Sequence, residues 1–302
     1  MYHGERPPLC GLNYFGYDRS FNIRRNYRSK RIIDGFTPRP YDAPWTGIML
    51  QNGKPRCTVT LISKKSTDKQ SHWAFTAKHC VHVEDDYDHD DQLFVGSRAL
   101  NKYNFIFGVH DTRVSTQQVV VRRADQAYLY PEEGLNPKDV ALLYFHKPIK
   151  FTNYINGLCL PDSEELVDLS ELNCFTCGWG ATLTSIIPRR ASNVLQCIKT
   201  EIEPPTPMHR INGDTNSILK IKYKGSAKGD SGGPIFCQRP TTGAQMFLFG
   251  LVHGGTSLSS NRYSTGARMT YFSAWAKVLI NQRVSCDKDA PSLESCCRFS
   301  KC

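Results

Sequence analysis

Ser231 lies in a turn crowded with glycines and is the residue of this chain best placed to do chemistry. Residues 228–234 read KGDSGGP, so a carboxylate precedes the serine and glycines flank the pair. Glycine tolerates positive φ angles and the close approach of other atoms. Such a turn can expose a hydroxyl while it aims consecutive backbone N–H groups at one point, as in an oxyanion hole. The turn therefore predicts a nucleophilic serine.

A serine nucleophile needs a base, and the base needs a carboxylate that orients it. His79 stands in the segment TAKHC at 76–80, at the end of an apolar run, and Asp139 leads into the apolar residues 140–143. The chain order is His, Asp, Ser, which is the order of chymotrypsin and not that of subtilisin or the α/β-hydrolases. We therefore predict a catalytic triad of His79, Asp139 and Ser231.

These segments and three others resemble the chymotrypsin/trypsin-like serine peptidase family, of which the chain is identified as a divergent member. The other segments are LCLP at 158–161, CGWG at 177–180 and GLVHGG at 250–255, and the likeness covers residues 32–281. The resemblance implies an all-β fold of two packed six-stranded antiparallel barrels with a short C-terminal helix, for which residues 275–282 have helical character. Short apolar runs separated by Gly, Pro and Asn are typical of such a fold.

By the same resemblance the chain is a serine endopeptidase that hydrolyses peptide bonds through an acyl-enzyme. Ser231 would attack the carbonyl, His79 would carry its proton, and Asp139 would hold the imidazole in place. The N–H groups of Gly229 and Ser231 would bind the developing oxyanion. Neither a metal nor an organic cofactor is expected.

Residues 1–31 are expected to be a basic pro-segment, because they hold seven Arg and Lys residues against two acidic ones. The IIDG that begins at Ile32 resembles the mature N-terminus of the family. Cleavage after Arg31 would free the Ile32 ammonium to pair with Asp230, since a buried charge must be paired. The RSKR that ends at Arg31 favours a furin-like convertase as activator, and a trypsin-like protease is the other candidate.

Twelve cysteines indicate an oxidising compartment, so the protein is expected to be secreted, although residues 1–31 lack the apolar core of a secretory signal. The other interpretation, zinc binding, has one C-x-x-C at 174–177 but no second ligand pair at finger spacing. The resemblance implies the pairs Cys57–Cys80, Cys174–Cys237, Cys10–Cys159 and Cys177–Cys197. The other cysteines, Cys286, Cys296, Cys297 and Cys302, fall in a Cys-rich tail over 282–302, and their pairing is open.

The resemblance places the substrate pocket at Gly225, Ser226, Lys228, His253 and Gly255. A pocket that binds arginine or lysine would have an aspartate where Gly225 stands, because a carboxylate is the strong partner of those side chains. Gly225 therefore predicts an uncharged and open pocket. Lys228 and the nearby Arg268 leave a preference for acidic residues open.

Positions 253 and 254 depart from the family, which often has a serine and a tryptophan there. These changes keep an alternative open, namely a catalytically weak or inactive protease-like binding or regulatory protein. A polyanion binder would draw on the formal charge of +10, but no basic run with interleaved aromatics supports it. The acidic run 84–91 is interpreted as a solvated loop or a selector of basic substrates, with calcium binding as the alternative.

The expected partners follow from this function. They are protein or peptide substrates, an activating convertase-like or trypsin-like protease, and protein inhibitors. Nucleic acid is not expected, and the sequence contains no apolar run long enough to span a membrane.

Overall fold

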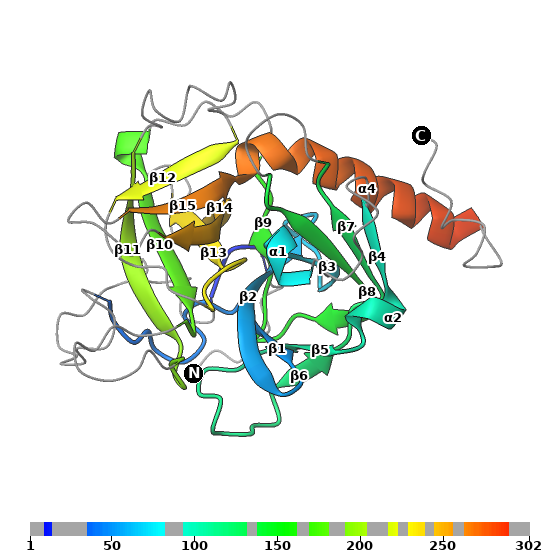
Figure 1. Ribbon diagram of the computed structural model, residues 1–302, viewed down its shortest axis with the longest axis horizontal. Coiled ribbons are helices and arrows are strands. Elements are labelled where there is room, and N and C mark those ends of the chain that lie inside the picture. Colours follow the sequence, from blue (N-terminus) through cyan, green and yellow to red (C-terminus); the bar gives the residue numbers. More distant parts are fainter. Residues whose placement is uncertain are drawn as a thin grey trace.

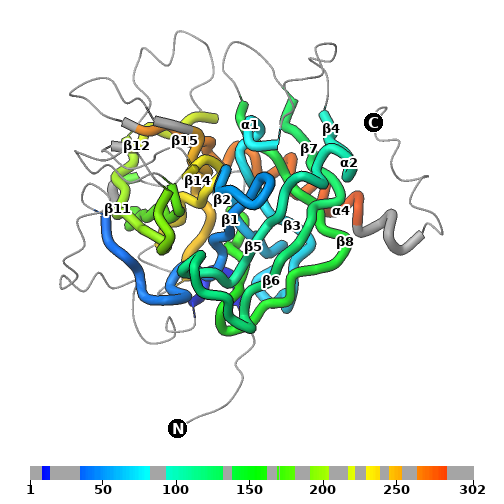
Figure 2. The backbone as a smooth tube through the Cα atoms, turned by 60° about the horizontal axis from the view of Figure 1, so that its bottom comes forward, coloured from blue at the N-terminus to red at the C-terminus, as the bar shows by residue number. Residues whose placement is uncertain are grey.

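The computed structural model describes residues 9–13, 35–81, 93–131, 138–161, 169–180, 191–203, 217–222, 229–238, 245–255 and 263–289. Most of these residues lie in β-strands that form two barrels, which stand side by side in Figures 1 and 2. The prediction of an all-β fold is therefore confirmed.

The first barrel contains seven strands within the described residues. Its strands are β1 (Thr46–Gln51), β2 (Lys54–Ser63), β3 (Gln70–Thr76), β5 (Tyr103–Phe107), β6 (Val120–Arg122), β7 (Gln126–Leu129) and β8 (Ala141–Lys150). The antiparallel pairs run β6–β5–β1–β2–β3–β8–β7. A short strand, β4 (Phe94–Gly96), adds to β7.

The second barrel is a closed antiparallel ring. Its strands are β10 (Asn173–Gly178), β11 (Gln196–Glu203), β12 (Ile218–Lys222), β13 (Pro234–Gln238), β14 (Met246–Gly255) and β15 (Tyr263–Arg268). The pairing order is β10–β11–β12–β15–β14–β13 and back to β10. The short β9 (Leu158–Cys159) pairs in parallel with β2 and with β14, so it joins the two barrels into one sheet.

Side chains fill each barrel, as expected of rings with few strands. Phe105, Phe107 and Phe145 pack edge to face inside the first barrel, and their side chains are fully buried. A separate apolar cluster around Ile235 and Phe249 fills the second barrel. Trp45 and Phe236 pack against each other in a third cluster that includes residues of both barrels.

The C-terminal helix α4 (Met269–Asp289) begins directly after β15 and is longer than the helix predicted for 275–282. Met269, Phe272, Ala276 and Ile280 are buried at spacings of three and four residues, which is the stripe of a helix that packs on a core. Further along, Arg283 stacks on the ring of Tyr144 in β8. The helix therefore starts at the second barrel and lies against the first (Figure 1).

The remaining short elements are the helices α1 (Lys78–Val81) and α2 (Ser97–Leu100) and the 3₁₀ turn η1 (Leu169–Glu171). Within the described residues, none of the helices combines the length and the apolar character needed to cross a bilayer.

Candidate active site

The pairing of β3 with β8 brings His79 and Asp139 together. Thr76 in β3 lies opposite Ala141 in β8, so the helix that follows β3 and the residues that precede β8 meet at one barrel end. Asp139 Oδ2 lies 2.7 Å from His79 Nδ1, and the backbone N–H of His79 donates to Asp139 Oδ1 at 2.8 Å. Both oxygens of the carboxylate thus fix the histidine, one through its ring and one through its backbone.

The turn that carries Ser231 depends on glycine at two positions. Gly229 and Gly232 have φ angles of 108° and 79°, which side chains rarely adopt. A Cβ at Gly232 would also come within 2.6 Å of the carbonyl oxygen of Thr58. The N–H of Gly232 donates to Val252 O at 2.7 Å, which ties the turn to β14.

Strand β2 of the first barrel holds the Ser231 turn of the second barrel. Thr58 donates through its hydroxyl to Gly229 O at 2.9 Å and through its backbone N–H to Ser231 O at 2.9 Å. Thr60 donates through its hydroxyl to Gly232 O at 3.0 Å. The sequence reasoning missed both threonines, because nothing in the run TVTL at 58–61 distinguishes them from ordinary strand residues.

The two predicted oxyanion donors are Gly229 and Ser231. Within the described part of the chain, neither of their backbone N–H groups donates a hydrogen bond. The turn therefore has two backbone donors available to a ligand, as the predicted oxyanion site requires.

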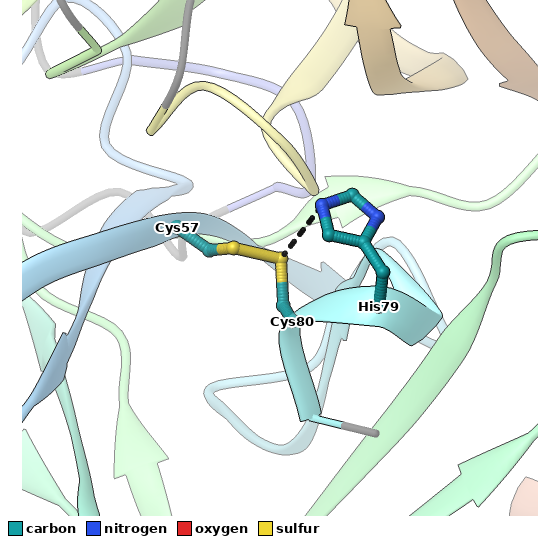
Figure 3. Close-up of side chains that lie close together, drawn as sticks. All are labelled: Cys57, His79 and Cys80. Atoms are coloured by element: carbon teal, nitrogen blue, oxygen red, sulfur yellow. Dashed lines mark hydrogen bonds between the residues drawn. A yellow bond between two sulfur atoms is a disulfide. The ribbon is translucent and has the colours of Figure 1, made fainter. Parts of the chain in front are cut away.

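The serine hydroxyl and the imidazole are not hydrogen-bonded to each other. Ser231 Oγ donates to the carbonyl oxygen of His253 at 3.1 Å, and His79 Nε2 lies 3.8 Å from Cys80 Sγ. Figure 3 shows one nitrogen of the His79 ring facing the Cys57–Cys80 disulfide. Hydrogen bonds of a catalytic pair are often loose in an unliganded enzyme, and the His79 side chain is 48 % exposed, so its ring has room to turn.

His253 places its imidazole on the carboxylate of Asp139. Its Nε2 lies 3.2 Å from Asp139 Oδ2, the oxygen that also meets His79. Burial raises the pKa of Asp139, but the hydrogen bond from His79 and the charge of His253 lower it more, so the net shift is downward. The predicted pocket residue His253 is therefore also a neighbour of the carboxylate of the predicted triad.

The glycines of the CGWG segment form a cradle for Asp230. The backbone N–H of Gly180 donates to Asp230 Oδ1 at 2.7 Å. A Cβ at Gly178 or Gly180 would meet the Asp230 carboxylate at 2.3 Å. From the sequence, this segment served only to support the family resemblance, and its contact with Asp230 was not predicted. Two glycines around a tryptophan could have indicated it, because glycine allows other atoms to approach the backbone closely.

The described residues contain four disulfides, and they join the four pairs expected from the sequence. Cys57–Cys80 clamps α1, which carries His79, to β2. Cys174–Cys237 and Cys177–Cys197 cross the paired strands β10–β13 and β10–β11. Cys10–Cys159 attaches the described segment 9–13 to β9.

Several residues predicted from the sequence lie outside the described residues. They are the pocket positions Gly225, Ser226 and Lys228, the activation positions Arg31 and Ile32, the acidic run 84–91, and Cys296, Cys297 and Cys302. Of the remaining pocket residues, His253 and Gly255 both belong to β14.

Comparison with known proteins supplies the family. Residues 32–276 match the family model described as Trypsin. The curated relatives include the atrial natriuretic peptide-converting enzymes of Mus musculus, 25% identical over 256 residues, and of Homo sapiens, 24% identical over 259 residues. In both cases 82% of this chain is aligned, but only 21% and 22% of the relative's length. The chain thus spans about a fifth of these relatives.

Proposed function

The chain belongs to the trypsin family, and on that premise we propose that it is a serine endopeptidase. The observation that carries this proposal is the convergence of His79, Asp139 and the Ser231 turn, with two unbonded N–H groups beside the serine. Members of this family act on proteins, so the proposed substrates are proteins or peptides.

The proposed reaction uses each side chain at a stated atom. When a substrate enters, His79 Nε2 accepts the proton of Ser231 Oγ as that oxygen attacks the carbonyl carbon. Asp139 Oδ2 keeps the proton on Nδ1 and stabilises the imidazolium, while the N–H groups of Gly229 and Ser231 bind the oxyanion. The imidazolium then donates its proton to the leaving amine, and water releases the acyl group by the same route in reverse.

We also propose activation by cleavage after Arg31, with residues 1–31 as pro-segment and 282–302 as a Cys-rich tail. The position of Asp230 supports this proposal, because its carboxylate lies among the backbone atoms of Gly178 and Gly180, where a new ammonium at Ile32 would find a charged partner. The activator would be a convertase-like or trypsin-like protease. The disulfides favour a secreted protein.

One observation favours the alternative, an inactive protease-like binding protein. Ser231 Oγ donates to His253 O and not to His79, so the nucleophile and base are not yet coupled. The test is labelling with a fluorophosphonate probe after cleavage at Arg31, with Ser231→Ala as control. Labelling of the native chain alone supports the peptidase, and absence of labelling in both supports the binding protein. A peptide-library digest would then measure specificity.

A further inference from the structure

The feature that the proposed reaction leaves unused is a second imidazole on the catalytic carboxylate. His79 Nδ1 and His253 Nε2 both face Asp139 Oδ2, at 2.7 Å and 3.2 Å. These three potential ligand atoms all lie within 4.8 Å of one another. Two imidazoles and one carboxylate are a donor set that zinc takes in proteins, with one coordination position left open.

Two of the three separations are close to those around a tetrahedral ion. Zinc bonds of about 2.0–2.2 Å at tetrahedral angles place neighbouring ligand atoms about 3.4 Å apart. The carboxylate already has His253 Nε2 at 3.2 Å, and His79 Nδ1 would have to retreat by less than an ångström. The His79 side chain is 48 % exposed and can make that shift, whereas the Asp139 side chain is only 6 % exposed.

The surroundings favour this group over the other cluster near the site. Asp139 Oδ1 accepts a hydrogen bond from the backbone N–H of His79, and this bond holds the carboxylate in the orientation that a metal ligand needs. The group formed by Cys57, His79 and Cys80 offers no thiolate, because the two sulfurs are joined to each other (Figure 3).

We propose that His79, Asp139 and His253 form a reversible inhibitory site for zinc or a similar transition-metal ion. The metal would bind His79 Nδ1, Asp139 Oδ2 and His253 Nε2. The proton on each of these nitrogens moves to the other ring nitrogen or to solvent, because a metal ligand must present a lone pair. His79 Nε2 then carries a proton and has no lone pair for the Ser231 hydroxyl, so catalysis stops until the metal leaves.

The inhibitory half of this inference rests on the proposed peptidase function, and the binding half does not. Binding is therefore measured on the full chain carrying Ser231→Ala, by calorimetric titration with ZnCl₂ and by the absorption spectrum with CoCl₂. We expect one zinc per chain and the intense visible bands of four-coordinate cobalt. MgCl₂ should not bind at this site, since imidazoles suit zinc and not magnesium. Absence of His253-dependent zinc binding would overturn the inference.

The decisive variants change the second imidazole. His253→Gln keeps a hydrogen-bond donor of similar reach and His253→Ser supplies a hydroxyl, but neither provides an imidazole ligand. Either change should weaken zinc binding at least about 100-fold, since even outer-shell changes weaken it by 10–100-fold. His146→Ser removes an exposed histidine far from the site and should leave zinc affinity unchanged. Two variants are used so that the test still stands if one of them fails to fold. Equal zinc affinity in native, His253→Gln and His253→Ser proteins would contradict the proposal.

Inhibition is measured on the activated native chain as loss of fluorophosphonate labelling with added ZnCl₂ and its recovery with a chelator. Labelling of His253→Gln, expressed relative to the zinc-free labelling of the same variant, should not fall at zinc concentrations that block the native protein. If zinc binding depends on His253 but the activated native chain is never labelled, the metal site is supported and the peptidase function is contradicted. If the native chain is labelled and zinc does not reduce the labelling, the inhibitory site is contradicted and the peptidase function is supported.

Discussion

At the scale of single residues, the carboxylate of Asp139 is where the two histidines of the site meet. Its two oxygens accept the His79 backbone N–H and face two imidazoles. The hydrogen bond from His79 and the charge of His253 keep the pKa of the carboxyl below its usual value despite burial. The charged form is thus favoured in a place where an uncompensated carboxylate would be costly.

Replacing Asp139 by asparagine should separate geometry from charge. The amide would present a donor to His79 Nδ1 and force the wrong tautomer on the ring, so kcat on a peptide ester should fall about 10⁴-fold with little change in fold. Asp125→Asn, at a carboxylate whose Oδ2 accepts the His146 N–H away from the site, is the matched control. A loss smaller than tenfold in Asp139→Asn would show that this carboxylate does not orient the base.

At the scale of elements, the Ser231 turn is held from two sides. Strand β2 holds the turn through Thr58 and Thr60, and the end of β10 with the residues that follow it encloses Asp230 through Gly178 and Gly180. The first set of contacts fixes the backbone of the nucleophile. The contacts around Asp230 leave space for its carboxylate but not for a Cβ atom at Gly178 or Gly180.

Adding a methyl group to this cradle should therefore disable the site without unfolding the barrel. In Gly180→Ala the Cβ would lie 2.3 Å from the Asp230 carboxylate, so Asp230 must move and take the neighbouring Gly229–Ser231 N–H groups with it. We expect fluorophosphonate labelling to fall at least tenfold, which corresponds to about 1.4 kcal/mol. Gly96→Ala, whose Cβ would meet only a Phe94 ring atom at 3.6 Å, is the control. Normal labelling of Gly180→Ala would show that the cradle tolerates a side chain.

The sequence predicted the elements better than their contacts. The apolar runs 59–62 and 73–76 lie in β2 and β3 and are buried throughout, because a short apolar run rich in β-branched and aromatic residues is itself a local signal for a buried strand. The predicted start of the last helix at 275 was too late, because Met269 and Phe272 are equally compatible with a strand until β15 is seen to end at Arg268. The contacts of Thr58 span 171 residues of chain, and no local pattern encodes such a partner.

At the scale of the whole molecule, the segment 9–13 is held against both barrels. Cys10 is bonded to Cys159, Gly11 N–H donates to Gly157 O at 2.8 Å, and the N–H of Met246 donates to Gly11 O at 2.8 Å. Asn156 Nδ2 also donates to Leu9 O and Leu12 O. A cut at Arg31 would leave all of these contacts in place.

The pro-segment should accordingly stay attached after activation. Cleaved protein should run as one species on a non-reducing gel and as two after reduction, because Cys10–Cys159 links the pieces. The Cys10→Ser/Cys159→Ser double variant, which leaves no unpaired thiol at this position, should release the pro-segment more readily under denaturing conditions without reductant. Release of the native segment without reduction would contradict this pairing.

The two barrels also meet at His110, and this contact should make folding stability sensitive to pH. The carbonyl oxygen of His110 accepts the indole N–H of Trp179 at 3.3 Å and the backbone N–H of Leu195 at 2.8 Å, and Asp111 forms a bridge with Val194. The His110 Nδ1 atom is buried without a hydrogen-bond partner in the described residues. Burial lowers the pKa of His110 from 6.5, although Asp111 and Asp42 act in the opposite direction.

His110 binds a proton more tightly in the unfolded chain than in the folded chain. With a lowered pKa in the folded state, the unfolded chain takes up a proton first, so stability falls as the pH drops below 6.5 towards the folded pKa. Urea unfolding midpoints should therefore fall more steeply between about pH 8 and about pH 5.5 in native protein than in His110→Gln, both on a Ser231→Ala background that prevents self-digestion. Acid effects of the other groups are common to both proteins and cancel in the comparison. Parallel pH profiles would mean that His110 is protonated as easily in the folded chain as in the unfolded one.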